Sequence, residues 1–410
     1  MRHAILTSYI LYGIRIFLPI LILPLLSLRL GLNGFGQILA LQSLGLIGSL
    51  IVQFGFGSTA TRDIAQAKGK AALKAVIGNV LSAQILTSLL AMGFILLTSQ
   101  FNPYGDDKTA LLAGAIIIAL GAGISPAWYF RGTNRSQSGI ALDLTGQIFS
   151  VIGIFLFVHN PADLALAAFI LGSGPTLTSI FGIAVMRKEI GPFQIGHIGT
   201  AVKQLKDSTS LFIVRATSSG LTLGSAWYAS LLMTPEEVAY FGVAAKIISA
   251  LTSMSQPILY TLMPRAAHLV DRDSKAFFAL IKQWAPILMA LGIATTTAAF
   301  SLSPIIIDLL FGKDLMPALN ALHVLAWLCI ISAVRDILSD IILIPLKADR
   351  NVAITSIATF LFILALSIPL ALNYAALGIA IARLLGECFT AFFLFLIATR
   401  ELKRTNTLKR

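Results

Sequence analysis

Apolar runs of about 20 residues recur along the whole chain and limit its fold more than any other feature. Hydrophobic residues make up 57% of the 410 residues and charged residues 12%, whereas a globular chain carries roughly 25% charged residues. A helix needs about 20 apolar residues to cross a bilayer core of about 30 Å. Twelve runs fit this length: 5–28, 36–58, 75–98, 109–130, 138–158, 163–186, 208–232, 237–262, 281–303, 317–345, 351–372 and 375–399. The sequence therefore predicts an all-α integral membrane protein with about twelve transmembrane helices.

The first run is interpreted as a retained helix. It follows Met1-Arg2-His3, it is longer than the apolar region of a cleaved signal peptide, and no small-residue cleavage site follows it.

The net charge of +12 has an uneven distribution along the chain. With both termini in the cytoplasm, 22 of the 30 lysines and arginines lie in inner loops and tails, 3 lie in outer loops and 5 lie inside apolar runs. This asymmetry follows the positive-inside rule for membrane proteins. The basic charge therefore indicates topology and gives no reason to expect a nucleic-acid partner.

The loops divide the chain into two halves. Outer loops such as 159–163 and 311–316 are short, and the longest polar stretch, 187–208, lies midway along the chain. Within it, apolar residues from Ile195 to Leu205 recur at helical spacing, which favours an interfacial amphipathic helix; a disordered basic loop is the alternative. We predict an N-terminal lobe (1–190, six helices), a cytoplasmic amphipathic linker (191–207), a C-terminal lobe (208–399, six helices) and a basic cytoplasmic tail (400–410).

The two lobes resemble distant repeats. Arg15 lies in the opening helix of the first half and Arg215 in that of the second, and the next helix of each half begins near a Phe-Gly pair, at Phe35 and at Phe241. Transporters built from repeats bind substrate near the bilayer midplane, between the repeats. We therefore expect a central cationic cavity between the lobes.

Five basic side chains interrupt the apolar runs: Arg15, Arg215, Lys246, Arg335 and Arg383. A cation at the centre of a membrane helix costs at least about 2.5–3.5 kcal/mol on insertion scales. Guanidinium and ammonium groups suit phosphate, the first as a bidentate fork and the second as a point charge. These residues are the candidate substrate-binding groups for an anion, and buried structural ion pairs are the alternative.

Four acids in the runs are candidates for ion coupling: Asp143, Asp336, Asp340 and Glu387. Glu387 lies four residues after Arg383, on the same helix face, so this pair also fits a structural ion pair. Asp336 is adjacent to Arg335, and Asp340 lies near the end of the same apolar run. Asp143 is the candidate partner for the cations that have no acid within a turn of their own helix, which are Arg15, Arg215 and Lys246.

No cofactor or metal site is predicted. Cys329 and Cys388 lie far apart in apolar runs, and the five histidines show no ligand spacing. No phosphate-binding loop of an ATPase occurs, so energy must come from an ion gradient, the substrate gradient or consumption of the product. Trp128, Tyr129 and Phe130, at the end of the fourth run, are interpreted as part of an interfacial aromatic belt.

Three segments resemble the bacterial polysaccharide-biosynthesis transporters, specifically the O-antigen repeat-unit flippases. They are Leu30-Gly31-Leu32-Asn33-Gly34-Phe35-Gly36, the segment Phe54-Gly55-Phe56-Gly57-Ser58-Thr59-Ala60-Thr61-Arg62-Asp63-Ile64-Ala65, and Tyr240-Phe241-Gly242-Val243-Ala244-Ala245-Lys246-Ile247. Pro264-Arg265 is similar to the proline and basic residue that close the eighth helix in that family.

The resemblance implies the fold of the multidrug/oligosaccharidyl-lipid/polysaccharide exporter superfamily, in the bacterial inner membrane. It implies that the chain is not an enzyme but a flippase that moves an undecaprenyl-pyrophosphate-linked oligosaccharide to the periplasmic leaflet by alternating access. The implied partners are this glycan and the membrane lipids. A proton or sodium gradient is a candidate energy source, and the polymerase and chain-length proteins of lipopolysaccharide synthesis are candidate protein partners.

Three alternative functions are compatible with parts of this sequence. A multidrug exporter of the same superfamily would carry acids where this chain has Arg15, and an exporter of another lipid-linked precursor would need a similar basic cavity. A membrane enzyme of the same pathway, a glycan polymerase or ligase, would need a larger periplasmic loop than the outer loops of about ten residues or fewer seen here.

Overall fold

The computed structural model describes residues 2–101 and 108–408, and within them the chain is helical with short connections and no strand. Eight of the described helical segments are long and apolar enough to cross a membrane, or nine if one bent pair counts as a single span. This confirms the prediction of an all-α membrane protein. By its contacts the chain divides into two compact units, Met1–Val238 and Ala239–Arg410.

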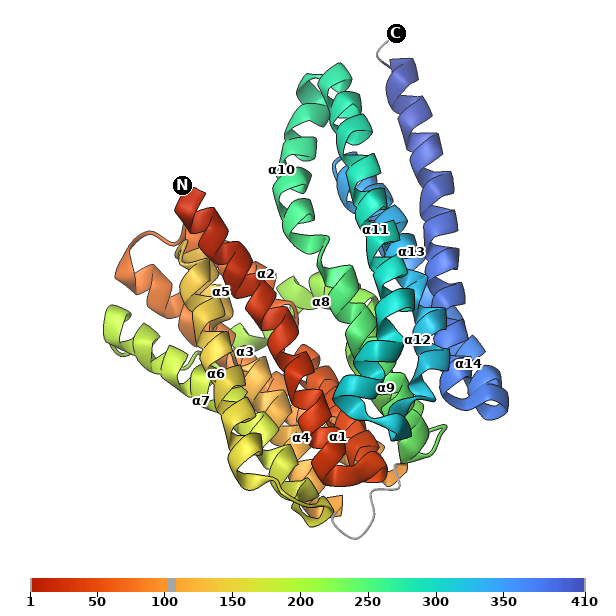
Figure 1. The fold of residues 1–410 in the computed structure, drawn as a ribbon. Coiled ribbons are helices and arrows are strands. Elements are labelled where there is room, and N and C mark those ends of the chain that lie inside the picture. Colours follow the sequence, from red (N-terminus) through yellow and green to blue (C-terminus); the bar gives the residue numbers. More distant parts are fainter. Residues whose placement is uncertain (1, 102–107, 409–410) are drawn as a thin grey trace. The chain divides into compact units, whose positions relative to one another are not determined.

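The first unit is built around α1 (Arg2–Gln53), which packs on α3, α4, α6 and α8 (Figure 1). Gly31 interrupts α1 with a φ of 68°, a backbone conformation that glycine adopts without the steric cost of a Cβ. The other helices of this unit are α2 (Phe56–Gln66), α3 (Gly69–Thr98), α4 (Lys108–Gly123), α5 (Ala127–Gly132), α6 (Ser136–Phe157), α7 (Leu164–Ile190) and α8 (Ile198–Ser230), with 3-10 turns η1 (Ser99–Phe101) and η2 (Pro161–Asp163).

Small residues bring the helices of this unit close together. A Cβ at Gly146 of α6 would lie 2.7 Å from the carbonyl oxygen of Gly174 in α7. Membrane helices associate by close packing rather than by a hydrophobic driving force, so such small residues are typical of their contacts.

A second interior contact corrects an expectation from the sequence. Trp128, Tyr129 and Phe130 are 2%, 2% and 4% exposed, and they pack with Phe56 and Ile64 of α2 in one apolar cluster. These rings therefore form protein core and not a lipid-facing belt. Sequence position alone did not distinguish the two, because a ring at the end of an apolar run fits either.

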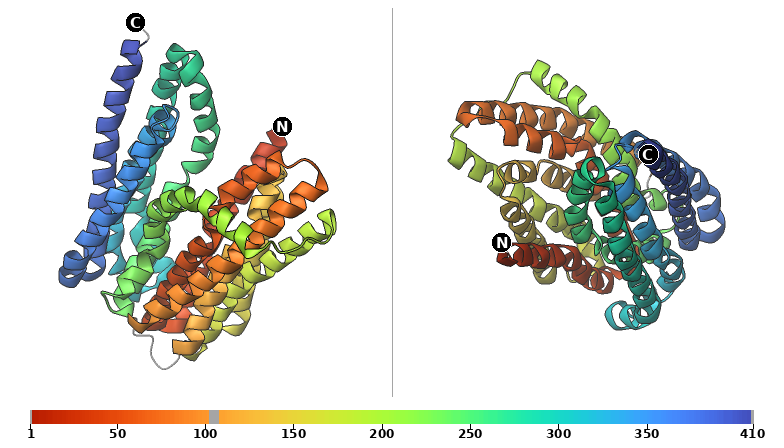
Figure 2. Two further views of the ribbon diagram at one scale, coloured as in Figure 1. Left: turned by 180° about the vertical axis from the view of Figure 1, so that it is seen from behind. Right: turned by 90° about the horizontal axis from the view of Figure 1, so that it is seen from above.

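The second unit is a bundle in which α11 packs on α12 and α13, and α14 packs on the same two helices (Figure 2). Its elements are α9 (Pro235–Ser253, which starts in the first unit), α10 (Gln256–Arg272), α11 (Ser274–Phe311), the 3-10 turn η3 (Lys313–Leu315), α12 (Ala318–Ala326), α13 (Leu328–Asp336), the π-helix η4 (Ile337–Leu343) and α14 (Asp349–Leu408). Ala375 interrupts α14 with φ 46° and ψ −127°.

Several predicted runs differ from the observed helices. The run 36–58 is broken near its end, where Phe54 and Gly55 adopt positive φ, and the run 317–345 consists of α12, α13 and η4. In the predicted linker 191–207, residues 191–197 are not helical. The rest of the linker and the predicted run that follows it form one continuous helix, α8, from Ile198 to Ser230. The two lobes and their boundaries stay predictions.

Candidate functional site

In the first unit, two guanidinium groups come together over Gly57 of α2. A Cβ built on Gly57 would lie 3.0 Å from Nη1 of Arg215, in α8, and 3.3 Å from Nη2 of Arg131, in α5. Arg215 was predicted as a substrate-binding residue. Arg131 was not, because it follows the fourth apolar run and reads as an ordinary inner-loop cation.

In the second unit, Arg335 is the centre of a charged cluster. Its Nη1 donates to both carboxylate oxygens of Glu387, in α14, at 2.9 Å, and its Nη2 donates to Oδ1 of the adjacent Asp336 at 2.9 Å. Asp336 is 4% exposed. A buried carboxylate of this kind requires a paired charge and hydrogen bonds, and Arg335 supplies both.

A hydroxyl group completes the environment of Asp336. The Ser255 hydroxyl lies 3.1 Å from Oδ2 of Asp336 and 3.0 Å from the Thr252 carbonyl oxygen, so it shares one proton between the two acceptors. The cluster therefore ties α13 to α14 and to the turn between α9 and α10.

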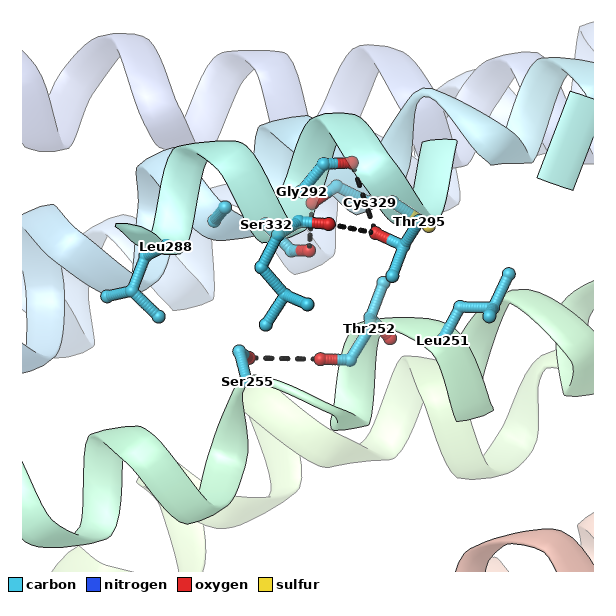
Figure 3. A pocket seen from close by; sticks show the side chains of 10 residues that line it. Leu251, Thr252, Ser255, Leu288, Gly292, Thr295, Cys329 and Ser332 are labelled. Carbon is cyan, nitrogen blue, oxygen red and sulfur yellow. Dashed lines mark hydrogen bonds between the residues drawn. The ribbon is translucent and has the colours of Figure 1, made fainter. Parts of the chain in front are cut away.

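Beside this cluster a small pocket is lined by hydroxyl and apolar groups. Thr252 and Ser255 lie on one side of it, and Thr295, Ser332, Cys329 and Gly292 lie on the other (Figure 3). The hydroxyls of Thr295 and Ser332 bond back to carbonyl oxygens of their own helices. The pocket therefore presents few polar groups to a ligand.

The other predicted site residues are placed as follows. Lys246 lies in α9 and Arg383 in α14, both half-buried. Asp143 lies half-buried in α6, and Asp340 lies in the π-helix η4, where it accepts a hydrogen bond from Ser339 at 2.8 Å. Arg15 lies in α1, and its side chain falls outside the described part of the structure.

The structure thus brings Arg335, Asp336 and Glu387 into direct contact and sets Arg215 beside Arg131. The spacing on one helix makes Arg383 and Glu387 a candidate pair, which stays a prediction. The structure shows that Glu387 bonds to Arg335 of α13. Spacing along one helix could not reveal this contact, because the two residues are 52 positions apart.

Sequence reasoning also missed a polar contact at the ends of α5, α6 and α7. Arg135 makes two hydrogen bonds of 2.7 Å with the carboxylate of Glu189, which also accepts one of 2.7 Å from the Tyr129 hydroxyl. The Glu189 carboxylate raises the pKa of Arg135 above its ordinary value. Only the apolar context of Tyr129, a phenol that needs a partner when buried, gave a signal for this contact.

The long apolar helices of the described residues define a class, that of multi-pass membrane proteins. The chain matches the structure described as "Lipid II flippase MurJ, inward closed conformation" with a TM-score of 0.71 and 14% identity over 98% of this chain and 90% of that one. It also matches a structure of the MATE multidrug transporter DinF-BH with a TM-score of 0.66 and 11% identity, covering 97% and 94%. These likenesses show that the chain shares the fold of these two proteins.

Residues 4–270 match the family described as "Polysaccharide biosynthesis protein", and the chain belongs to this family. It is similar to two proteins, each named "Putative O-antigen transporter". The one from Shigella dysenteriae is 23% identical over 96% of this chain and 99% of its own length, and the one from Escherichia coli (strain K12) is 24% identical over 98% of each. The protein is a multi-pass protein of the bacterial inner membrane.

Proposed function

We propose that this protein is a flippase that moves an undecaprenyl-pyrophosphate-linked oligosaccharide, an O-antigen or similar repeat unit, from the cytoplasmic to the periplasmic leaflet by alternating access. The observation that carries the proposal is the full-length similarity to proteins named as O-antigen transporters. The MurJ-like fold supports it, because that fold is used by a protein described as a lipid II flippase.

The membrane-embedded cations support an anionic substrate. Arg215 lies in α8 beside a second arginine, and Lys246 lies half-buried in α9. Charged residues at membrane depth are costly and mark substrate or ion pathways. The residues proposed to contact substrate are Arg15, Arg215, Lys246, Arg335 and Arg383. Arg335 also pairs with Asp336 and Glu387.

Twelve crossings are proposed for the topology. Helix α1, with 52 residues, and α14, with 60, are about 78 Å and 90 Å long at about 1.5 Å per residue, far more than a bilayer core of about 30 Å. We infer that each crosses twice, bending at Gly31 and at Ala375. With α3, α4–α5, α6, α7, α8, α9–α10, α11 and α12–η4 as single crossings, both basic termini lie in the cytoplasm.

Ion coupling is proposed for the acids that are not neutralised by Arg335. Asp143 and Asp340 fit this role better than Glu387, whose two oxygens both bond to Arg335. We further propose that the chain is not an enzyme and that a polymerase and chain-length protein act on the unit it delivers.

The experiment that tests the function locates the lipid-linked repeat unit in cells that lack this protein. We expect the unit to accumulate on the cytoplasmic face and to reach the periplasmic face again when the intact chain is restored, but not with Arg215→Ala at equal membrane levels. Accumulation of unpolymerised units on the periplasmic face would instead identify a polymerase or ligase.

A further inference from the structure

The segment between α7 and α8 is fixed along the side of α3. The backbone N–H of Gly196 donates to the carbonyl oxygen of Gly78 at 3.2 Å, and a Cβ on Gly78 would collide with the carbonyl oxygen of Gln194. The ring of Phe193 packs against an apolar cluster of the first unit. Residues 191–197 are therefore held in place, although they are not helical.

The contacts with α3 give the depth of this segment in the membrane. A Cβ on Gly191 would lie 3.3 Å from Nζ of Lys74, and a Cβ on Gly196 would lie 2.7 Å from Oδ1 of Asn79. Asn79 is about 8 Å further along α3 than Lys74, at about 1.5 Å per residue. On the proposed topology α3 enters the membrane from the cytoplasm, so the segment descends by about this distance. Amphipathic helices at a membrane surface bury their apolar face by about 5–10 Å, which is the same depth.

The start of α8 and the residues before it present exposed apolar side chains at this depth. Ile195, Ile198 and Val202 are 61%, 72% and 42% exposed. Ile198 and Val202 are four residues apart, so they lie on one face of α8, whereas Ala201 and Ser208 face the protein and are 1% and 0% exposed. The exposed face is therefore available to the acyl chains of the cytoplasmic leaflet.

Two lysines lie beside this apolar face. Lys206 follows Val202 by four residues, and Lys203 and Lys206, three residues apart, share a face. Both are exposed, and neither forms an ion pair with another described residue. A lysine keeps its methylene groups on an apolar surface while its ammonium group reaches outward to polar surroundings. The two ammonium groups therefore lie at the level of lipid headgroups.

The surrounding charge favours an anion at this position. Residues 187–208 hold four basic residues and two acids. One of the acids, Glu189, is already paired with Arg135 at 2.7 Å, which leaves Asp207 as the other. The segment thus combines an exposed apolar face with an excess of positive charge, the combination that binds anionic lipid surfaces.

We propose that Lys203 and Lys206, together with the face formed by Ile198 and Val202, bind the headgroups of anionic phospholipids in the cytoplasmic leaflet. Each ammonium group meets a headgroup phosphate as a point charge, and the isoleucine and valine side chains lie among the first methylene groups of the acyl chains. The site depends on the proposed topology and not on which molecule the protein transports.

The test measures binding of dioleoyl phosphatidylglycerol to the purified full-length protein by native mass spectrometry, with dioleoyl phosphatidylcholine as the neutral comparison probe. We expect phosphatidylglycerol to bind more tightly. Lys203→Gln combined with Lys206→Gln should weaken its binding at least about tenfold, because each basic residue near an anionic surface contributes roughly a factor of five.

The matched control is Lys68→Gln combined with Lys70→Gln, which removes the same charge from exposed positions at the start of α3. This variant should bind phosphatidylglycerol like the unaltered protein. Equal binding of the two lipids to the unaltered protein would overturn the site. Unchanged phosphatidylglycerol binding in the Lys203 and Lys206 variant would also overturn it, as would an equal loss in the control.

A second measurement locates the apolar face. A nitroxide attached to Val202→Cys is placed in a Cys388→Ala background, because Cys388 is exposed and Cys329 is buried. In nanodiscs that contain phosphatidylglycerol, this label should be more accessible to oxygen than to a water-soluble nickel chelate, and a label on Lys70→Cys should show the reverse. Equal nickel access at both positions would place the face in water. That result would identify a docking surface for a soluble protein and would overturn the lipid site.

Discussion

At the scale of single residues, charge is accommodated in two different ways. In the second unit, Arg335 is neutralised by Glu387 and Asp336. In the first, Arg131 and Arg215 lie together over a glycine. The arrangement around Arg335 stabilises a contact between helices, and the pair of arginines places two positive charges close together. The five membrane cations that look equivalent in the sequence are therefore not equivalent in the folded chain.

The contact between Arg335 and Glu387 predicts energetic coupling. Arg335→Ala leaves the carboxylates of Asp336 and Glu387 without their cation, and Glu387→Ala removes one acid from the same cluster. Because the side chains are only 32% and 20% exposed, we expect a coupling energy of about 1–3 kcal/mol. Thermal or denaturant unfolding of the two single variants and the double variant in detergent measures it.

The matched comparison for this prediction is the pair Arg383 and Glu387, four positions apart on α14. If Arg383→Ala couples to Glu387→Ala as strongly as Arg335→Ala does, then Glu387 divides its charge between the two arginines. If the effects of Arg335→Ala and Glu387→Ala on the free energy of unfolding simply add in the double variant, the contact between the two side chains contributes no stability.

At the scale of helices, glycines decide how closely neighbours pack. A Cβ on Gly146 or Gly174 would meet the backbone of the other helix, which cannot move aside as a side chain can. We expect Gly174→Val to destabilise the α6–α7 contact by at least about 1–3 kcal/mol, the usual cost of overpacking, and to lower the amount of folded protein. Fluorescence-detected size exclusion measures that amount.

Gly93 of α3 is the control for this change, because nothing lies within 4 Å of a Cβ built there. Gly93→Val should express and fold like the unaltered chain. Equal losses from both substitutions would mean that valine in a membrane helix, and not the close α6–α7 approach, causes the defect.

The break in α14 predicts a stabilising substitution. Ala375 has φ 46° and ψ −127°, a conformation that costs a residue with a Cβ about 1–3 kcal/mol. Ala375→Gly should therefore raise the thermal midpoint by relieving this strain. Ala358→Gly, in a regular part of the same helix, should lower it, because glycine costs about 1 kcal/mol relative to alanine in a helix. A lower midpoint for Ala375→Gly would argue against a strained bend.

At the scale of the whole molecule, the proposed topology makes a prediction about the two sides of the membrane. The positive-inside rule places Asn160 and Lys313 in the periplasm and Lys203 and Arg350 in the cytoplasm, and all four residues are exposed. Cysteines introduced at the first two positions should react with an impermeant maleimide in intact cells. Those at the last two should react only after the cells are opened.

The background for this experiment is the unaltered chain, in which Cys329 is buried and Cys388 is exposed within the α14 span. Labelling of Asn160→Cys and Arg350→Cys from the same side would contradict the arrangement of twelve crossings with both termini in the cytoplasm.

The sequence alone determined that the chain folds in a bilayer and that its fold is all-α, and it favours an anionic substrate. Blocks of about 20 apolar residues require helices in a bilayer, and cations within those blocks favour an anion. These conclusions depend on composition and local spacing, which are visible along one chain, and three short segments were enough to indicate the family.

Only the tertiary structure decided which charges meet. Glu387 bonds to an arginine 52 positions away in the sequence. Arg131 lies close to Arg215 because glycines let α5 and α8 approach the start of α2. The tertiary structure also decided that Trp128 packs against α2 in the protein core and does not face lipid. Hydropathy sets whether a helix enters the membrane, but not which of its faces meets which neighbour. That choice depends on close packing between segments that are distant in the chain.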